Sequence, residues 1–206
     1  LTRGLPALGN ATRTNPQASE KFINILTSKR NPERVLRLMN ESGVLGRYMP
    51  DFGRIVAMMQ FDMYHSYTVD EHTIQVIGIL HDIESGKLAE TAPVATEVMP
   101  EIESRRALFV AALLHDMAKG RGGDHSILGA ELALEMCPRL GLSPEETETV
   151  SWLVRHHLLM SKTAFRYDLN DPKTIEDFAT IVQSPERLKL LLVLTVADIR
   201  GVGPTV

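Results

Sequence analysis

The sequence predicts an all-α fold for its 206 residues. A helix-start signal recurs four times, as a polar capping residue followed by a proline at the first helical position. Apolar residues recur three and four positions apart, which is the spacing of one face of a helix. No stretch alternates apolar and polar residues in the manner of a half-buried strand. These observations together favour a bundle of helices.

The expected elements follow from these signals along the chain. The helix starts are Asn31-Pro32, Ser143-Pro144, Asp171-Pro172 and Ser184-Pro185. Gly43 and Gly141 stand where a left-handed cap would end a helix. We expect helices at 17–28, 32–42, 51–60, 68–84, 102–118, 125–137, 144–159, 173–182 and 185–199. Residues 85–101 are expected to form a loop, and the first fifteen residues a linker.

Composition narrows the classes of protein. Hydrophobic residues make up 44% of the chain, which is enough to bury a core. The net charge of −4 and the scattered basic residues argue against nucleic acid or an anionic membrane as a partner. The single cysteine, Cys137, excludes intrachain disulfide bonds and favours the reducing cytoplasm. The start at Leu1 and the ending GVGPTV are typical of a domain excised from a longer protein.

The segment HDMAKGRGGDHS, residues 115–126, is the first unusual feature. It follows the apolar run ALFVAALL, so His115 and Asp116 end a helix that is expected to be buried. Burying an imidazole and a carboxylate is costly unless a partner satisfies them. A divalent metal ion is such a partner, because both groups are common metal ligands. The alternative for an isolated His-Asp pair is a capped helix end.

Three other apolar helices carry polar groups of the same kind. Asp198 is the only carboxylate near the end of the run LKLLLVLTVADI, and His72 precedes the apolar segment TIQVIGIL. His156 and His157 lie in the run WLVRHHLL. Four helices thus direct metal-capable side chains toward a common interior. The alternative requires four separate buried polar groups, each with hydrogen bonds of its own.

The order of these residues resembles the HD superfamily of metal-dependent phosphohydrolases. His72 is followed by His115-Asp116 after 43 positions, and Asp198 follows Asp116 after 82. The fold implied is an HD-domain helical bundle with a short helical N-terminal extension. We expect the extension and a linker at residues 1–50 and the HD phosphohydrolase domain at 51–206.

The resemblance is closer still to one subfamily, the bacterial PII uridylyltransferase/uridylyl-removing enzymes. It rests on MMQFDMYHSYTVDEHT at 58–73, LLHDMAKGRGGDHSILGAELA at 113–133 and LTVADIRGVGP at 194–204. In those enzymes the HD domain removes UMP from a uridylylated tyrosine of the PII nitrogen-regulatory protein. Other domains of the full-length enzyme transfer UMP and sense glutamine, and neither is recognisable in this sequence.

The resemblance also implies roles for the unusual residues. A divalent ion, Mn²⁺ or Mg²⁺, and a second ion beside it would be held by His72, His115, Asp116, Asp198, His125 and His156. Asp116 would bridge the two ions. Lys119 would meet the charge that develops on phosphorus during hydrolysis. Three neighbours have two interpretations each: His157 is a ligand or positions one, while Arg155 and Arg200 bind substrate phosphate or are solvated or ion-paired.

Some neighbouring features have simpler interpretations. The glycines of GRGGD do not follow a strand, so we expect a tight turn that delivers His125 to the site. His81 is nine positions after His72, half a turn away from the ligand face, so we expect it at the surface or hydrogen-bonded. His65 precedes the same helix and stays ambiguous.

Three functions fit the sequence. The first is the uridylyl-removing phosphodiesterase. The second is an HD hydrolase of a free nucleotide or an alarmone such as ppGpp, which would need no protein partner. The third is an HD module that binds a ligand or partner without catalysis. Its signature would be a missing ligand, and the chain retains the full set.

Overall fold

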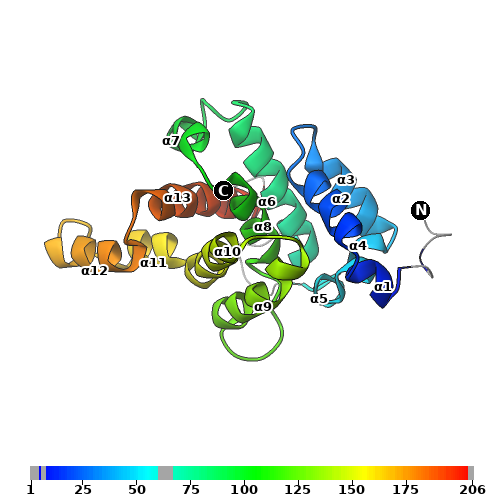
Figure 1. The fold of residues 1–206 in the computed structure, drawn as a ribbon. Helices are drawn as coiled ribbons and strands as arrows, with labels where there is room; N and C mark the ends of the chain where they lie inside the picture. The colour runs from blue at the N-terminus through cyan, green and yellow to red at the C-terminus, as the bar shows by residue number, and fades with distance from the viewer. Residues whose placement is uncertain (1–4, 6–7, 60–66, 204–206) are drawn as a thin grey trace.

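The computed structural model describes residues 5, 8–59 and 67–203, and most of them are helical (Figure 1). The elements are α1 (Asn10–Arg13), α2 (Pro16–Leu26), α3 (Pro32–Glu41), α4 (Val44–Tyr48), α5 (Pro50–Gly53), α6 (Val69–Glu84), α7 (Pro93–Val98), the 3₁₀-helix η2 (Met99–Glu101), α8 (Arg105–Leu114), α9 (His125–Arg139), α10 (Pro144–His156), α11 (Leu159–Arg166), α12 (Pro172–Val182) and α13 (Pro185–Arg200). Within the described residues, β-type pairing is limited to one isolated bridge between Met59 and Thr68. The predicted all-α fold is confirmed.

The predicted helix starts are confirmed, because local chemistry specifies them. A backbone N–H of the first turn is accepted by the side chain of each capping residue, Asn31, Ser143, Asp171 and Ser184. The proline that follows each cap has no N–H to leave unpaired in that turn. The two predicted glycine caps are left-handed, with φ of 73° at Gly43 and 83° at Gly141.

Two buried helices, α6 and α8, run through the middle of the bundle (Figure 1). Residues 107–114 of α8 are all fully buried. α6 packs against α3 on one side and α13 on another, while α8 packs against α6, α10 and α13. α9 packs on the outside of α10. The ends of α6, α8, α10 and α13 therefore meet inside the bundle, which is where the predicted site residues lie.

The predicted helix at 51–60 is wrong, and residue 60 itself lies outside the described residues. The chain forms the short helices α4 and α5 and then turns at Ala57, whose φ of 57° is left-handed and ends any helix. Asp70, which is buried, accepts the backbone N–H of Ala57 at 3.1 Å and the side-chain amide of Asn40 at 2.7 Å. A tertiary contact thus overrides the local helical pattern.

Two predicted helices are shorter than expected. The helix expected at 102–118 ends at Leu114, because the next backbone hydrogen bonds reach back three residues, from Met117 to Leu114 and from Lys119 to Asp116. The helix expected at 144–159 ends at His156, and α11 starts separately at Leu159. Both breaks fall directly beside predicted metal ligands.

Two regions expected to be irregular contain helices. The predicted loop at 85–101 contains α7 and η2, whose residues Ala95 and Met99 are buried against the core. α7 begins with Pro93 at its first position, which is the same signal as elsewhere but without a capping side-chain hydrogen bond. The first fifteen residues include the four-residue helix α1.

One core joins the N-terminal helices to the rest. Buried residues of α2, α3 and α4 belong to the same apolar cluster as those of α6 and α8. The domain boundary expected between residues 50 and 51 stays a prediction.

No helix in the described part of the chain combines the length and the apolar character that a membrane span requires.

Candidate metal centre

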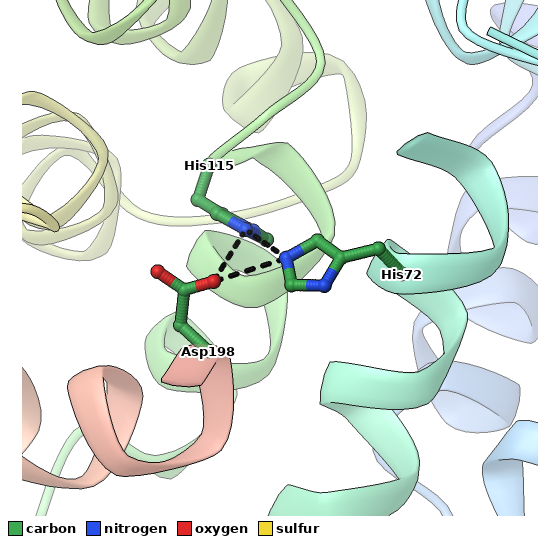
Figure 2. Close-up of side chains that lie close together, drawn as sticks. All are labelled: His72, His115 and Asp198. Carbon is green, nitrogen blue, oxygen red and sulfur yellow. Dashed lines mark hydrogen bonds and ion pairs between the residues drawn. The ribbon is translucent and has the colours of Figure 1, made fainter. Parts of the chain in front are cut away.

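Three side chains from separate parts of the chain meet in the middle of the bundle (Figure 2). His72 lies in the first turn of α6, His115 directly follows α8, and Asp198 lies near the end of α13. His72 Nε2 is 3.3 Å from His115 Nε2 and 3.0 Å from Asp198 Oδ1. His115 Nε2 is 3.6 Å from the same oxygen. These three residues form the first cluster, and their ligand atoms face one small space.

Asp116 joins this first cluster to a second one. Its Oδ2 lies 3.4 Å from His115 Nε2 and 3.6 Å from His72 Nε2. Its Oδ1 lies 3.5 Å from His125 Nε2 and 3.9 Å from His157 Nε2. Asp116, His125 and His157 form the second cluster. One carboxylate thus faces both clusters, as a bridging Asp116 requires.

Backbone carbonyls fix which imidazole nitrogen faces the clusters. The Nδ1 atoms of three rings lie 3.0, 2.7 and 2.7 Å from a backbone oxygen; the pairs are His72 with Gly201, His115 with Ala112 and His157 with Val154. A carbonyl oxygen can only accept, so each Nδ1 carries the hydrogen and donates it. Each neutral ring therefore turns the lone pair of Nε2 toward its cluster, which is the arrangement that holds histidine ligands in metal sites.

The spacing of the ligand atoms fits a metal ion. Ligand atoms about 2.0–2.2 Å from a common ion lie about 3.0–3.5 Å from one another. Two of the three distances in the first cluster, 3.0 and 3.3 Å, lie within this range, and the third, 3.6 Å, exceeds it by about 0.1 Å. Without a cation, the lone pairs of His72 and His115 would face each other beside two carboxylates. In the second cluster, His125 Nε2 is buried and has no hydrogen-bond partner among the described residues.

The electrostatics of the clusters also favour a positive charge. Burial disfavours a charged His115, but the carboxylates of Asp116 and Asp198 outweigh burial and raise its pKa from 6.5 to about 10. Burial likewise opposes ionisation of Asp116, but His115 and Lys119 hold its pKa well below the usual range. The pKa of Asp198 is lowered in the same way by His115 and His72. In a metal-free protein, a proton on His115 supplies the charge that a cation would supply.

The second cluster contains His157, whereas we expected His156 to hold the second ion, with His157 as a further ligand or a residue that positions one. Neighbouring residues on a helix point about 100° apart, so only one of the two can face the interior. His157 is buried, whereas the half-buried ring of His156 lies 5.0 Å from the ring of Trp152. Burial lowers the pKa of His157 to about 4, so it stays neutral and able to bind a metal at neutral pH.

The segment GRGGD, residues 120–124, forms the expected turn between His115 and His125. Gly120, Gly122 and Gly123 all have left-handed φ values, between 74° and 98°. The turn leads into α9, where Asp124 caps the helix by accepting the N–H of Ser126 at 2.8 Å. The first residue of α9 is His125, whose side chain is 26% exposed. The turn therefore delivers His125 to the second cluster.

Lys119 lies at the edge of the clusters. Its Nζ is 2.7 Å from Asp116 Oδ2, and its side chain is 22% exposed. Lys119 follows the end of the expected helix at 102–118, and a tight turn brings it to Asp116. The partly exposed side chains of Lys119, His125 and Asp198 thus form the rim through which solvent reaches the otherwise buried ligands.

The remaining predicted residues lie outside the clusters. Arg200 donates to Thr91, to its backbone oxygen at 3.2 Å and its hydroxyl at 2.9 Å, so its guanidinium is held by the segment before α7. Arg155 is exposed beside His156. His81 belongs to neither cluster. Its Nδ1 is buried and has no hydrogen-bond partner among the described residues, whereas we expected it at the surface or hydrogen-bonded. His65 lies outside the described residues.

Two protein-family models match separate parts of the chain. A family model described as "HD domain" matches residues 85–199, and one described as "Uridylyltransferase GlnD third domain" matches residues 1–48. The HD match includes His115, Asp116 and Asp198. His72 lies outside it, and the structure places this residue in the same cluster.

Curated relatives named "Bifunctional uridylyltransferase/uridylyl-removing enzyme" match nearly the whole chain. The relative from Azospirillum brasilense is 63% identical over 204 residues, which are 99% of this chain and 22% of the relative. The relative from Novosphingobium aromaticivorans is 63% identical over 196 residues, or 95% of this chain and 22% of the relative. The relative from Rhodospirillum rubrum is 59% identical over 206 residues, or 100% of this chain and 22% of the relative.

The chain therefore spans about a fifth of the length of these relatives. The resemblance noted in the sequence is confirmed, and the His and Asp clusters fit the divalent metal of such domains. Because the HD-domain model matches more than half of its residues, the chain belongs to the HD domain family.

Proposed function

We propose that the chain hydrolyses a phosphodiester with one or two divalent ions, Mn²⁺ or Mg²⁺, held by the two clusters. The observation that carries this proposal is the position of Asp116, whose two oxygens face separate sets of histidines. His72, His115 and Asp198 would hold one ion, and His125 and His157 the other. A bound divalent ion supplies an acidified water and neutralises charge on phosphoryl oxygens.

The residues of the chain orient and charge this site. Three imidazoles are held by backbone carbonyls, so they need no rearrangement to present Nε2. Lys119 places its Nζ 2.7 Å from the shared carboxylate, at the solvent-facing rim. A phosphate that enters through this rim therefore meets a preorganised donor, which is the arrangement that stabilises charge developing in a transition state.

We assign the substrate as a uridylylated tyrosine of the PII protein, in the cytoplasm. The names of the relatives support this assignment, because they specify removal of a uridylyl group. In the reaction, a bond forms between a water oxygen and phosphorus, and the bond from phosphorus to the tyrosine oxygen breaks. UMP and tyrosine result. The phenolate, with a pKa of about 10, is a good leaving group and takes its proton from solvent.

The test combines metal analysis with hydrolysis of uridylylated PII. Asp116→Asn should remove both metal binding and UMP release, because it takes a negative charge and a shared ligand from both clusters. The matched control is Asp82→Asn, which removes a carboxylate that pairs with Lys87 at the surface. It should retain metal and activity. Full activity of Asp116→Asn would show that the site lies elsewhere.

Other outcomes favour the alternative functions. Turnover of free nucleotides or ppGpp, with no release of UMP from uridylylated PII, would favour the small-molecule hydrolase. Metal binding without hydrolysis of any of these substrates would favour the non-catalytic binding module.

A further inference from the structure

A pocket of about 250 Å³ is lined by residues that adjoin the two histidines of the second cluster in the sequence. Its lining includes Asp124 and Ser126, the neighbours of His125 in the chain, and His156 and Leu158, the neighbours of His157. Consecutive Cα atoms are 3.8 Å apart, so the pocket begins one residue from both histidines of that cluster. Whatever is attached to a phosphate at the clusters has this pocket within reach.

Two positively charged side chains of the pocket lack an ion pair among the described residues, and they outnumber its one carboxylate, Asp124. Arg155 and Lys162 line it, both are exposed, and neither has an ion pair within the part of the chain that the structure describes. Arg187, by contrast, is paired with Glu148. The carboxylate of Asp124 is engaged in capping α9. The pocket therefore offers several free N–H donors to an acceptor-rich ligand.

The rest of the lining is apolar. Ile127, Leu158 and Leu159 contribute aliphatic side chains to the same pocket. Binding pockets for larger ligands usually have volumes of about 300–1,000 Å³, so this one suits a small group. A pyrimidine nucleoside matches these features, because it combines a flat ring with carbonyl and hydroxyl oxygens that accept hydrogen bonds.

We infer that this pocket binds the nucleoside of a nucleotidylated substrate, with Arg155 and Lys162 donating to its oxygens. This inference rests on the proposed function, because it takes the scissile phosphate to lie at the two clusters. The pocket then receives the half of the substrate that leaves as a nucleoside monophosphate. The protein half, which is far larger than 250 Å³, approaches from the open rim.

The first test is a binding titration that needs no turnover. UMP is titrated into the Mn²⁺-loaded chain, and binding is followed by the fluorescence of Trp152, the only tryptophan. Its ring lies 5.0 Å from the ring of His156, which lines the pocket. Arg155→Gln and Lys162→Gln should each weaken UMP binding by about 3- to 10-fold, which is the effect of one charged hydrogen bond at a partly open site.

A matched control and a competitor make this result specific. Lys173→Gln removes another exposed lysine, which pairs with Asp177 on α12, and should leave UMP affinity unchanged. Inorganic phosphate, followed by displacement of UMP, lacks the nucleoside, so the ratio of UMP affinity to phosphate affinity should fall in both pocket variants. Unchanged UMP affinity, or an equal loss of affinity for phosphate, would overturn the inference.

The second test separates this inference from the proposed function. Wild-type kcat/KM is compared for uridine 5′-(4-nitrophenyl phosphate) and methyl 4-nitrophenyl phosphate, which differ in the nucleoside. The wild-type chain should prefer the uridine ester, and the double variant Arg155→Gln/Lys162→Gln should reduce that preference. Equal wild-type values would refute the pocket assignment while leaving hydrolysis intact. Hydrolysis of neither ester, together with no release of UMP from uridylylated PII, would refute the proposed function, and the UMP titration would then decide the pocket by itself.

The pocket could instead receive an acidic segment of the protein substrate, and this alternative has its own signature. In that case, the double variant would raise KM only for uridylylated PII and leave the preference between the two small esters unchanged. That outcome would overturn the nucleoside assignment.

Discussion

Gly201 offers a test of the metal site that replaces none of its ligands. Its backbone oxygen accepts the hydrogen of His72 Nδ1 at 3.0 Å. Its φ of −73° is one that alanine adopts readily, so Gly201→Ala introduces no backbone strain. The added Cβ would lie 2.7 Å from Val76 Cγ2 and 3.2 Å from both Cε1 and Nδ1 of His72. The methyl group therefore presses directly on a ligand ring.

The expected effect follows from these distances. Carbon atoms in contact prefer a separation of about 3.5–4.0 Å, so the Val76 contact is too short by about 1 Å and the His72 contacts by a few tenths of an ångström. Overpacking of this kind costs about 1–3 kcal/mol of unfolding free energy. Disturbing the group that orients a histidine ligand lowers metal affinity by about 10- to 100-fold. We expect both effects in Gly201→Ala.

Metal affinity is measured by competition with a chelating dye, and stability by thermal unfolding of the metal-free protein. The matched control is Gly46→Ala, whose Cβ would lie 3.0 Å from Gly53 Cα, in a contact between α4 and α5. It should lower the melting temperature by about 2–4 °C per kcal/mol without weakening metal binding. Wild-type metal affinity in Gly201→Ala, together with a lowered melting temperature in both variants, would refute the role of this contact.

Three further predictions concern the ligands and their neighbours. His157→Ala should lower metal content, measured by elemental analysis, more than His156→Ala, because only His157 faces the second cluster; equal losses would contradict this. Lys119→Ala should lower kcat on a small phosphodiester by about 10²–10³ with metal content retained, as loss of one preorganised donor does. An unchanged kcat would show that Lys119 only holds Asp116 in place and does not act in catalysis. Metal binding requires neutral His115, whose pKa is raised to about 10, so affinity should increase by about tenfold per pH unit between pH 7 and 9. Calorimetry in buffers of different ionisation enthalpy should show proton release, and a flat pH profile would contradict it.

Local chemistry made much of the fold predictable. A polar cap followed by a proline needs only its own first turn, so the starts of α3, α10, α12 and α13 could be identified from the sequence. The helix expected at 51–60 failed because Ala57 is held by Asp70, a residue that arrives from another element. The local pattern of apolar residues does not reveal that contact.

The candidate ligands also divide into those that local sequence patterns identify and those that depend on tertiary contacts. His72, His115, Asp116 and Asp198 were identifiable because buried polar groups on apolar helices need partners. The choice between His156 and His157, at the end of α10, was also encoded in the sequence. His157 is spaced three, four and seven residues from the buried Val154, Leu153 and Val150, which is the spacing of one helix face. His156 shares only Leu153 with that face.

A single local device holds two of the histidines. His115 and His157 each directly follow the last residue of a helix, where the carbonyls of the final turn lack intrahelical donors. Each ring folds back and donates Nδ1–H to the carbonyl three residues earlier, at 2.7 Å in both cases. This contact satisfies a helix end and presents Nε2 to a metal at the same time.

His72 is held in a different way, by a backbone oxygen 129 residues away in the sequence. Its orientation therefore depends on α6 and the end of α13 being packed together, which no local pattern specifies. Two histidines are positioned by their own helices, whereas the third is positioned only once the bundle has formed. A metal held by His72 would therefore join α6 to α8 and α13 and stabilise the folded bundle relative to the unfolded chain.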